Sequence, residues 1–79
     1  MKGGFTEKQG QYLAFIYNYT KIHGQPPAEW EMERYFRVSP ASVHQMIVKL
    51  ENGGLLQRVP GQPRSLRVIV PVEELPHLL

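Results

Sequence analysis

The 79-residue chain contains no cysteine and no aspartate. Without cysteine it can form neither disulfide bridges nor thiolate zinc sites, and it has no cysteine nucleophile, so packing must stabilise the fold. Seven glutamates are its only carboxylate side chains, which is a poor supply for chemistry that needs paired carboxylates. Its three histidines, His23, His44 and His77, lack the close spacing of a metal site. We therefore expect no metal site, no cofactor and no enzymatic activity.

Long apolar runs are missing as well. The N-terminus has no run of signal-peptide length, and no window approaches the roughly 18 apolar residues of a membrane helix. These absences predict a soluble, cytoplasmic protein that does not bind membranes. The residues that are present, 42% hydrophobic and including one Trp, four Tyr and three Phe, are sufficient to fold one small domain. The small size disfavours an enzyme with a deep cleft.

Two helices are predicted in the first half of the chain. The segment Thr6-Glu7-Lys8-Gln9 has the pattern of a capping box, so a helix should begin at about residue 7. Gly10 should cost this helix about 0.5 to 1 kcal/mol, and Gly24 should end it. Pro26 and Pro27 cannot continue a helix, and a second helix of about eight residues should follow them.

Ser39 and Pro40 indicate the start of a third helix. Serine is a strong N-cap, and proline suits the first helical position because its missing amide proton does no harm there. The helix should run to about residue 52, and its other faces carry the small and hydrogen-bonding side chains that a helix needs to contact base edges. The buried stripe should comprise Val43, Ile47 and Leu50, with Met46 at its edge.

Two short apolar segments follow, at residues 55–59 and 65–70, and Pro60-Gly61-Gln62-Pro63-Arg64 between them is typical of a turn. Segments this close must pair as a β-hairpin. The order of elements predicts an α+β fold that is mainly α: a three-helix winged helix-turn-helix with a C-terminal two-stranded β-hairpin as its wing. We expect this domain to occupy residues 6–70, between an N-terminal tail (1–5) and a C-terminal tail (71–79).

Four segments carry a family pattern: Thr6-Glu7-Lys8-Gln9, His23-Gly24-Gln25-Pro26-Pro27, Ser39-Pro40-Ala41-Ser42 and Leu50-Glu51-Asn52-Gly53-Gly54-Leu55. Because these segments occur in this order and at this spacing, the chain resembles the N-terminal DNA-binding domain of the LexA repressor family over about residues 5–69. The resemblance implies a bacterial, sequence-specific regulator of transcription that binds double-stranded DNA and is associated with the nucleoid. LexA repressors continue into a self-cleaving serine-lysine peptidase domain that also dimerises. We expect this chain to lack that domain, and with it self-cleavage and a direct role in the damage switch.

In LexA-like domains the base contacts come from the start of the third helix. A glutamine can form a bidentate pair with adenine, and His44 could instead bond a phosphate. The position of Ala41 carries a side-chain amide in the LexA repressor, so the DNA sequence that this chain recognises can differ. The alternative is a helix surface that is simply solvated. The base contacts implied by the resemblance are Ser39, Ala41, Ser42, His44 and Gln45.

Cationic and polar side chains around this helix are candidates for phosphate contacts, which position a protein without selecting a sequence. Arg64 is the strongest candidate because it stands at a wing tip rich in Gly and Pro. Arg58 and Arg67 could instead pair across the hairpin, and any exposed cation can simply be solvated. The full set is Arg37, Lys49, Arg58, Gln62, Arg64 and Arg67.

Protein partners are the main alternative to DNA. The formal charge is only +2, and Glu29, Glu31 and Glu33 form an acidic run around Trp30. These features favour a winged helix that serves as an adaptor and binds no DNA. A single DNA-binding module contacts few base pairs, so a homodimer on a two-part site is also expected, with the C-terminal tail or the first helix at its interface.

Overall fold

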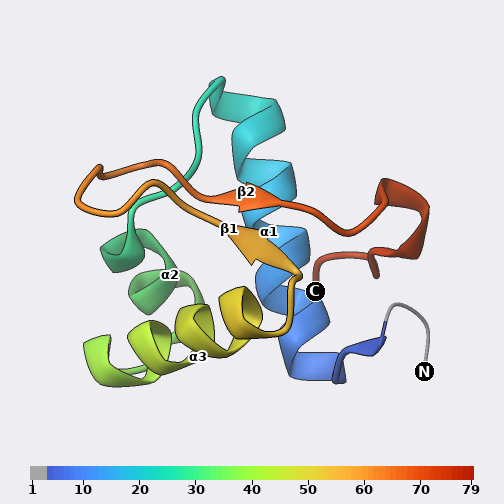
Figure 1. Cartoon of the computed structure of the whole chain (residues 1–79), viewed down its shortest axis with the longest axis horizontal. Helices are drawn as coiled ribbons and strands as arrows, with labels where there is room; N and C mark the ends of the chain where they lie inside the picture. Colours follow the sequence, from blue (N-terminus) through green and yellow to red (C-terminus); the bar gives the residue numbers. More distant parts are fainter. Residues whose placement is uncertain (1–3) are drawn as a thin grey trace.

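The computed structural model describes residues 4–79 and contains three α-helices followed by a small antiparallel sheet. It confirms the predicted fold class, a mainly helical winged helix-turn-helix with a C-terminal hairpin (Figure 1). The elements are α1 (Glu7–His23), α2 (Glu29–Phe36), α3 (Pro40–Asn52), β1 (Leu56–Gln57), β2 (Arg67–Val68) and the 3-10 turn η2 (Val72–Glu74).

Local signals at the ends of α1 act as predicted. The Thr6 hydroxyl accepts from the amide of Gln9 at 3.1 Å, and the Gln9 side chain accepts from the amide of Thr6 at 2.9 Å, which completes the capping box. Gly24 ends the helix in the left-handed conformation, with φ 78°. These bonds satisfy backbone amides and carbonyls that the helix leaves without partners.

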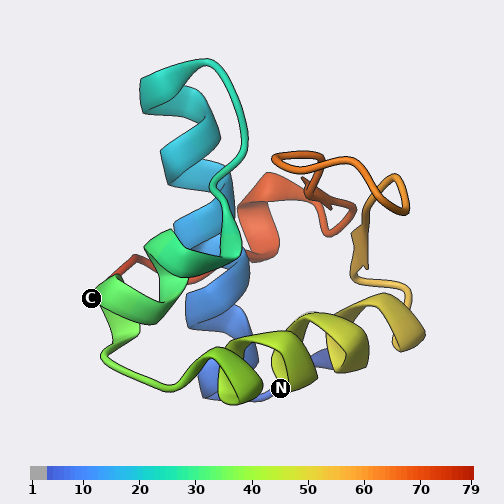
Figure 2. The ribbon, with the colours of Figure 1, turned by 90° about the vertical axis from the view of Figure 1, so that its left-hand side faces the viewer.

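The turn between α2 and α3 sets the start of the third helix. Arg37 closes α2 in the left-handed conformation, with φ 56°, and Val38 packs inward against the core. Ser39 then caps α3 by accepting from the amide of Ser42 at 3.1 Å. Figure 2 shows the short connection that brings the two helices together.

The core lies between the three helices and the hairpin. Val43, Ile47 and Leu50 are fully buried on α3, as the periodicity predicts, and Met46 lies at the edge of this stripe. The ring of Tyr12 on α1 stacks on the ring of Phe36 on α2, with centroids 4.2 Å apart. β2 packs on α1, and β1 packs on α3 (Figure 1). The wing is therefore held against the side of the helical core.

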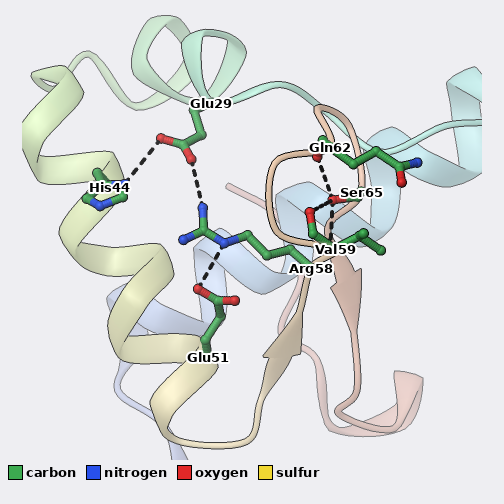
Figure 3. Close-up of polar contacts among 7 residues, drawn as sticks. All are labelled: Glu29, His44, Glu51, Arg58, Val59, Gln62 and Ser65. Carbon is green, nitrogen blue, oxygen red and sulfur yellow. Dashed lines mark hydrogen bonds and ion pairs between the residues drawn. The ribbon is translucent and has the colours of Figure 1, made fainter.

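The hairpin has the predicted partners but shorter strands. Leu56 pairs with Val68, and Gln57 pairs with Arg67. The prediction of strands over 55–59 and 65–70 was too long because the wing loop is closed by a side chain. The Ser65 hydroxyl accepts from the amide of Val59 at 3.0 Å and donates to the carbonyl of Gln62 at 2.8 Å (Figure 3). The amide of Val59 is thereby used by the loop and is unavailable for a ladder.

Both ends of the described chain pack on α1. Leu75 and Leu78 lie against the core, and the Gln11 side chain binds the backbone of both His77 and Leu79, at 2.9 Å each. These contacts partly bury Leu75 and Leu78, whereas Val72 and Leu79 of the same segment remain exposed. Residues 1–3 of the expected N-terminal tail lie outside the described residues.

Gly10 has a packing reason to be glycine. Phe5 from the expected N-terminal tail is buried in the core, with 6% exposure. A Cβ at Gly10 would lie 2.9 Å from the ring of Phe5 and 3.0 Å from Pro76. Because glycine has no side chain, the two terminal segments can approach α1 closely at this position. This close packing accounts for a residue that lowers the helix propensity of α1.

Candidate nucleic-acid interface

The N-terminal half of α3 presents an exposed, hydrogen-bonding surface. Ala41, Ser42, His44 and Gln45 are all exposed, and so is the cap residue Ser39. Their spacing of three or four residues places them side by side on the helix. The Ser39 hydroxyl is used within the fold, because it accepts from the Ser42 amide and donates to the Ser42 hydroxyl at 3.0 Å. That bond leaves the proton of the Ser42 hydroxyl available to an outside acceptor.

Glu29, the first residue of α2, joins this surface to the base of the wing (Figure 3). One carboxylate oxygen lies 3.8 Å from Nδ1 of His44, and the other lies 3.4 Å from Nη1 of Arg58. Nε of Arg58 is in turn 3.2 Å from a carboxylate oxygen of Glu51. Arg58 is thus held by carboxylates from α2 and α3, and not by a partner across the hairpin, which was the alternative to the expected phosphate contact.

Three other predicted cations remain exposed. Arg37 lies at the turn before α3, Lys49 lies on α3, and Arg67 lies on β2. None of them forms an ion pair among residues 4–79. Gln62 is exposed in the wing loop. These side chains provide exposed donors at the turn before α3, on α3 itself and in the hairpin.

Arg64 is turned toward the helices. Its backbone is left-handed, with φ 53°, and its guanidinium donates to a carboxylate oxygen of Glu31 at 2.7 Å. It also lies 3.4 Å from the Tyr19 hydroxyl and from the carbonyl of Pro26. The expectation that Arg64 extends from the wing tip to a phosphate does not match this placement. The structure instead uses Arg64 to tie the wing loop to α1 and α2.

No set of three His or Glu side chains in residues 4–79 is arranged to hold a metal ion. Within the same range, every helix is too short or too polar to cross a membrane. The exposed side chains of α3 and the contacts of Glu29 and Arg58 define the candidate interface, which is the polar face built from α3, the first turn of α2 and the hairpin.

Comparison with known proteins places this arrangement in a family. Residues 1–65 match the model of the LexA DNA binding domain. The chain belongs to the LexA DNA-binding domain family. This membership confirms the resemblance carried by the capping box, the double proline and the Ser39-Pro40 helix start.

The curated relatives that match this LexA-type domain include several LexA repressors. The chain is 38% identical over 63 residues to the LexA repressor of Thermotoga petrophila, covering 80% of the chain and 32% of the relative. It is 33% identical over 64 residues to that of Thermosipho melanesiensis, covering 81% of the chain and 32% of the relative. It is 35% identical over 65 residues to the LexA repressor of Bartonella quintana, covering 81% of the chain and 27% of the relative. The chain spans about a third of the length of these relatives.

The contacts around Glu31 shift the pKa of Glu31 and the pKa of Arg64. Burial raises the pKa of Glu31, but hydrogen bonds from the Tyr19 hydroxyl, the Ala28 amide and Arg64, together with the charge of Arg64, outweigh it and leave the pKa below the ordinary value. The pKa of Arg64 is raised by its hydrogen bonds to Tyr19 and Glu31. The ionised forms of both partners are therefore favoured in this LexA-type domain. Glu31 also replaces the missing side-chain cap at Ala28, since its carboxylate accepts from that amide at 2.7 Å.

Replacing Glu31 by Gln should destabilise the domain by about 1 to 3 kcal/mol near neutral pH, because a charged acceptor of three hydrogen bonds is lost. A carboxylate with a lowered folded pKa contributes stability above its unfolded pKa and loses it as the pH falls through the folded value. The difference between wild type and Glu31→Gln should therefore be full above about pH 5 and should shrink below it. Chemical denaturation at several pH values measures this difference.

Glu33→Gln is the matched control, since Glu33 is on the same helix and its carboxylate has no ion pair among residues 4–79. It should change stability by no more than about 0.5 kcal/mol. A Glu31→Gln variant whose stability follows the wild-type pH curve would show that this cluster does not stabilise the fold.

Residue types and spacing did not indicate that Glu29 and Glu51 lie beside the interface. In the sequence Glu29 belongs to an acidic run, and a carboxylate in the first turn of α2 is already explained by its favourable interaction with the helix dipole. Its partner Arg58 lies 29 residues further along the chain. No local pattern indicates a contact at that separation.

Proposed function

We propose that this LexA-type domain is a sequence-specific, double-stranded DNA-binding transcriptional regulator. The N-terminal half of α3 enters the major groove, and the wing lies against the adjacent backbone. The proposal rests chiefly on the exposed face of α3, where small and hydrogen-bonding side chains share the helix with Lys49, a cation that forms no ion pair among residues 4–79. The membership of the chain in a DNA-binding domain family gives it independent support.

The exposed side chains suit two kinds of contact. Gln45 has the donor and acceptor pair that matches adenine, while Ser42 and His44 can bond base edges or phosphates. Ser39 orders the start of the helix, and the small Ala41 allows close approach to the groove. Phosphate contacts come from Arg37, Lys49, Arg58, Gln62 and Arg67. Arg64 is left out of this set because its guanidinium lies 2.7 Å from Glu31, which is closer than either carboxylate contact of Arg58, at 3.2 and 3.4 Å.

Selection of bound duplexes from a random pool tests the proposal directly. Wild type should enrich a defined sequence, and Gln45→Ala should lose preference at one base position by about 1 to 3 kcal/mol, which is about 5- to 150-fold. The physical reason is that alanine cannot form the bidentate pair. Binding to selected and altered duplexes, measured by fluorescence anisotropy, provides the number.

Lys49→Ala is the comparison variant from the same helix. It should weaken binding to all duplexes alike, because a phosphate contact carries no sequence information. A pool with no enriched sequence would contradict sequence-specific binding. Unchanged preferences in Gln45→Ala would contradict the proposed role of that side chain.

A further inference from the structure

Glu29 occupies a position that the proposed function does not use. It is a carboxylate next to the surface assigned to base contacts, and its side chain retains 36% exposure. It touches two proposed DNA-contacting residues, His44 at 3.8 Å and Arg58 at 3.4 Å. A negative charge at this place opposes the approach of phosphates and also pairs with a cation that could bind them.

The two contacts of Glu29 have different consequences. Arg58 is only 30% exposed and lies between Glu29 and Glu51, so a phosphate must compete with two carboxylates for its guanidinium. Proteins bind unrelated DNA sequences mainly through phosphate contacts. The competition for Arg58 therefore weakens the complex with unrelated DNA.

The contact with His44 acts in the other direction. The His44 side chain is 58% exposed, and its Nδ1 faces Glu29. Because the two ring nitrogens lie on different sides of the imidazole, Nε2 is left for a partner outside the domain. Although 3.8 Å is longer than a hydrogen bond, the attraction between the carboxylate and a proton on Nδ1 favours this orientation of the ring. That benefit arises only where the DNA sequence offers a suitable group to His44.

We propose that Glu29 is a positioning residue that raises sequence discrimination, by withholding Arg58 from phosphates on unrelated DNA and by orienting His44 on a matching site. This inference rests on the proposed DNA-binding function. It differs from a scaffolding role, in which Glu29 would simply hold the wing and its removal would weaken all complexes. Specificity of this kind combines a favourable contact to the right partner with an unfavourable one to the wrong partner.

The test compares wild type and Glu29→Gln on a random-sequence duplex and on a duplex selected by the wild type, each at two or more salt concentrations. On the random duplex Glu29→Gln should bind about 3- to 5-fold more tightly, and its salt dependence should steepen by about one phosphate contact. On the selected duplex the gain should be smaller or absent. The affinity for the selected duplex divided by the affinity for the random duplex should therefore be about threefold lower, or lower still, in Glu29→Gln than in wild type.

Two further variants isolate the cause. Glu73→Gln removes the same charge from η2, which Figure 1 places at the opposite side of the view from α2, and should leave the ratio unchanged. In the Arg58→Ala background, Glu29→Gln should no longer tighten binding to the random duplex, since the cation that it releases is gone. Thermal unfolding confirms that each variant is folded.

Several results would overturn the inference. Equal weakening on both duplexes would show that Glu29 only supports the wing. If Glu73→Gln tightened binding to the random duplex as much as Glu29→Gln does, the effect would be one of general charge. The same conclusion would follow if Glu29→Gln still tightened that binding fully in the Arg58→Ala background. An unchanged affinity ratio would remove the role in discrimination. If folded wild type binds neither duplex at any salt concentration, the proposed function itself fails, which is a distinct outcome.

Discussion

Random-sequence duplex DNA is expected to bind this LexA-type domain with an affinity that falls about 40-fold as salt rises from about 50 to about 200 mM. Each cation that neutralises a phosphate releases counterions and adds about −0.9 to the slope of log affinity against log salt. On random DNA three cations are proposed to contact phosphates, because Glu29 withholds Arg58, and this predicts a slope of about −2.7. These three cations are Arg37, Lys49 and Arg67.

Anisotropy titrations at several salt concentrations measure this slope. Lys49→Ala should reduce its magnitude by about 0.9. Lys21→Ala is the matched control, because Lys21 lies in the last turn of α1, at the end of the domain away from α3 in both views (Figures 1 and 2). It should leave the slope unchanged. Absence of binding at the lowest salt concentration would favour the alternative in which the winged helix serves as a protein adaptor.

Ile47→Ala should destabilise the domain by about 2 to 5 kcal/mol. Ile47 is 0% exposed and lies in the middle of the inner stripe of α3, so the substitution loses buried methyl groups and leaves a cavity. In a domain of this size, each kcal/mol lowers the melting temperature by about 4 to 8 °C. Small domains have little stability to lose. Calorimetry or thermal circular dichroism should therefore show a fall of about 10 °C or more.

Gln45→Ala provides the contrast on the outer side of the same helix. Gln45 is exposed, so its replacement should change stability by no more than about 0.5 kcal/mol while removing a base preference. The two faces of α3 thus separate folding from DNA contact. A melting temperature of Ile47→Ala equal to that of Gln45→Ala would contradict the assignment of the inner stripe.

Much of the helical fold could be predicted from the sequence. Thr6 and Ser39 act as caps where their neighbours indicated, and Gly24 ends α1. The buried stripe of α3 also follows from its periodicity. The strand lengths were less accurate, because the Ser65 hydroxyl takes the amide of Val59. The packing of residues 71–79 on α1 was not anticipated, since that segment has no regular period.

The candidate site was predicted more unevenly. The exposed residues of α3 lie on one surface as expected, because helical spacing alone brings them together. The partners of the arginines did not follow from spacing. Arg64 was expected at the wing tip, yet it binds Glu31, and Arg58 binds Glu29 and Glu51. Sequence composition suggested only that these glutamates form an acidic run.

The sequence by itself determined where the helices of this protein begin and end and which side of α3 is buried. Caps and helical periodicity depend on residues three or four positions apart, so the chain contains that information locally. Only the tertiary structure decided which cations form ion pairs. The pairs Arg58 with Glu29 and Arg64 with Glu31 join residues 29 and 33 positions apart, and their formation depends on how the wing packs against the helices. The same packing places the carboxylate of Glu29 beside the surface that we propose to contact bases.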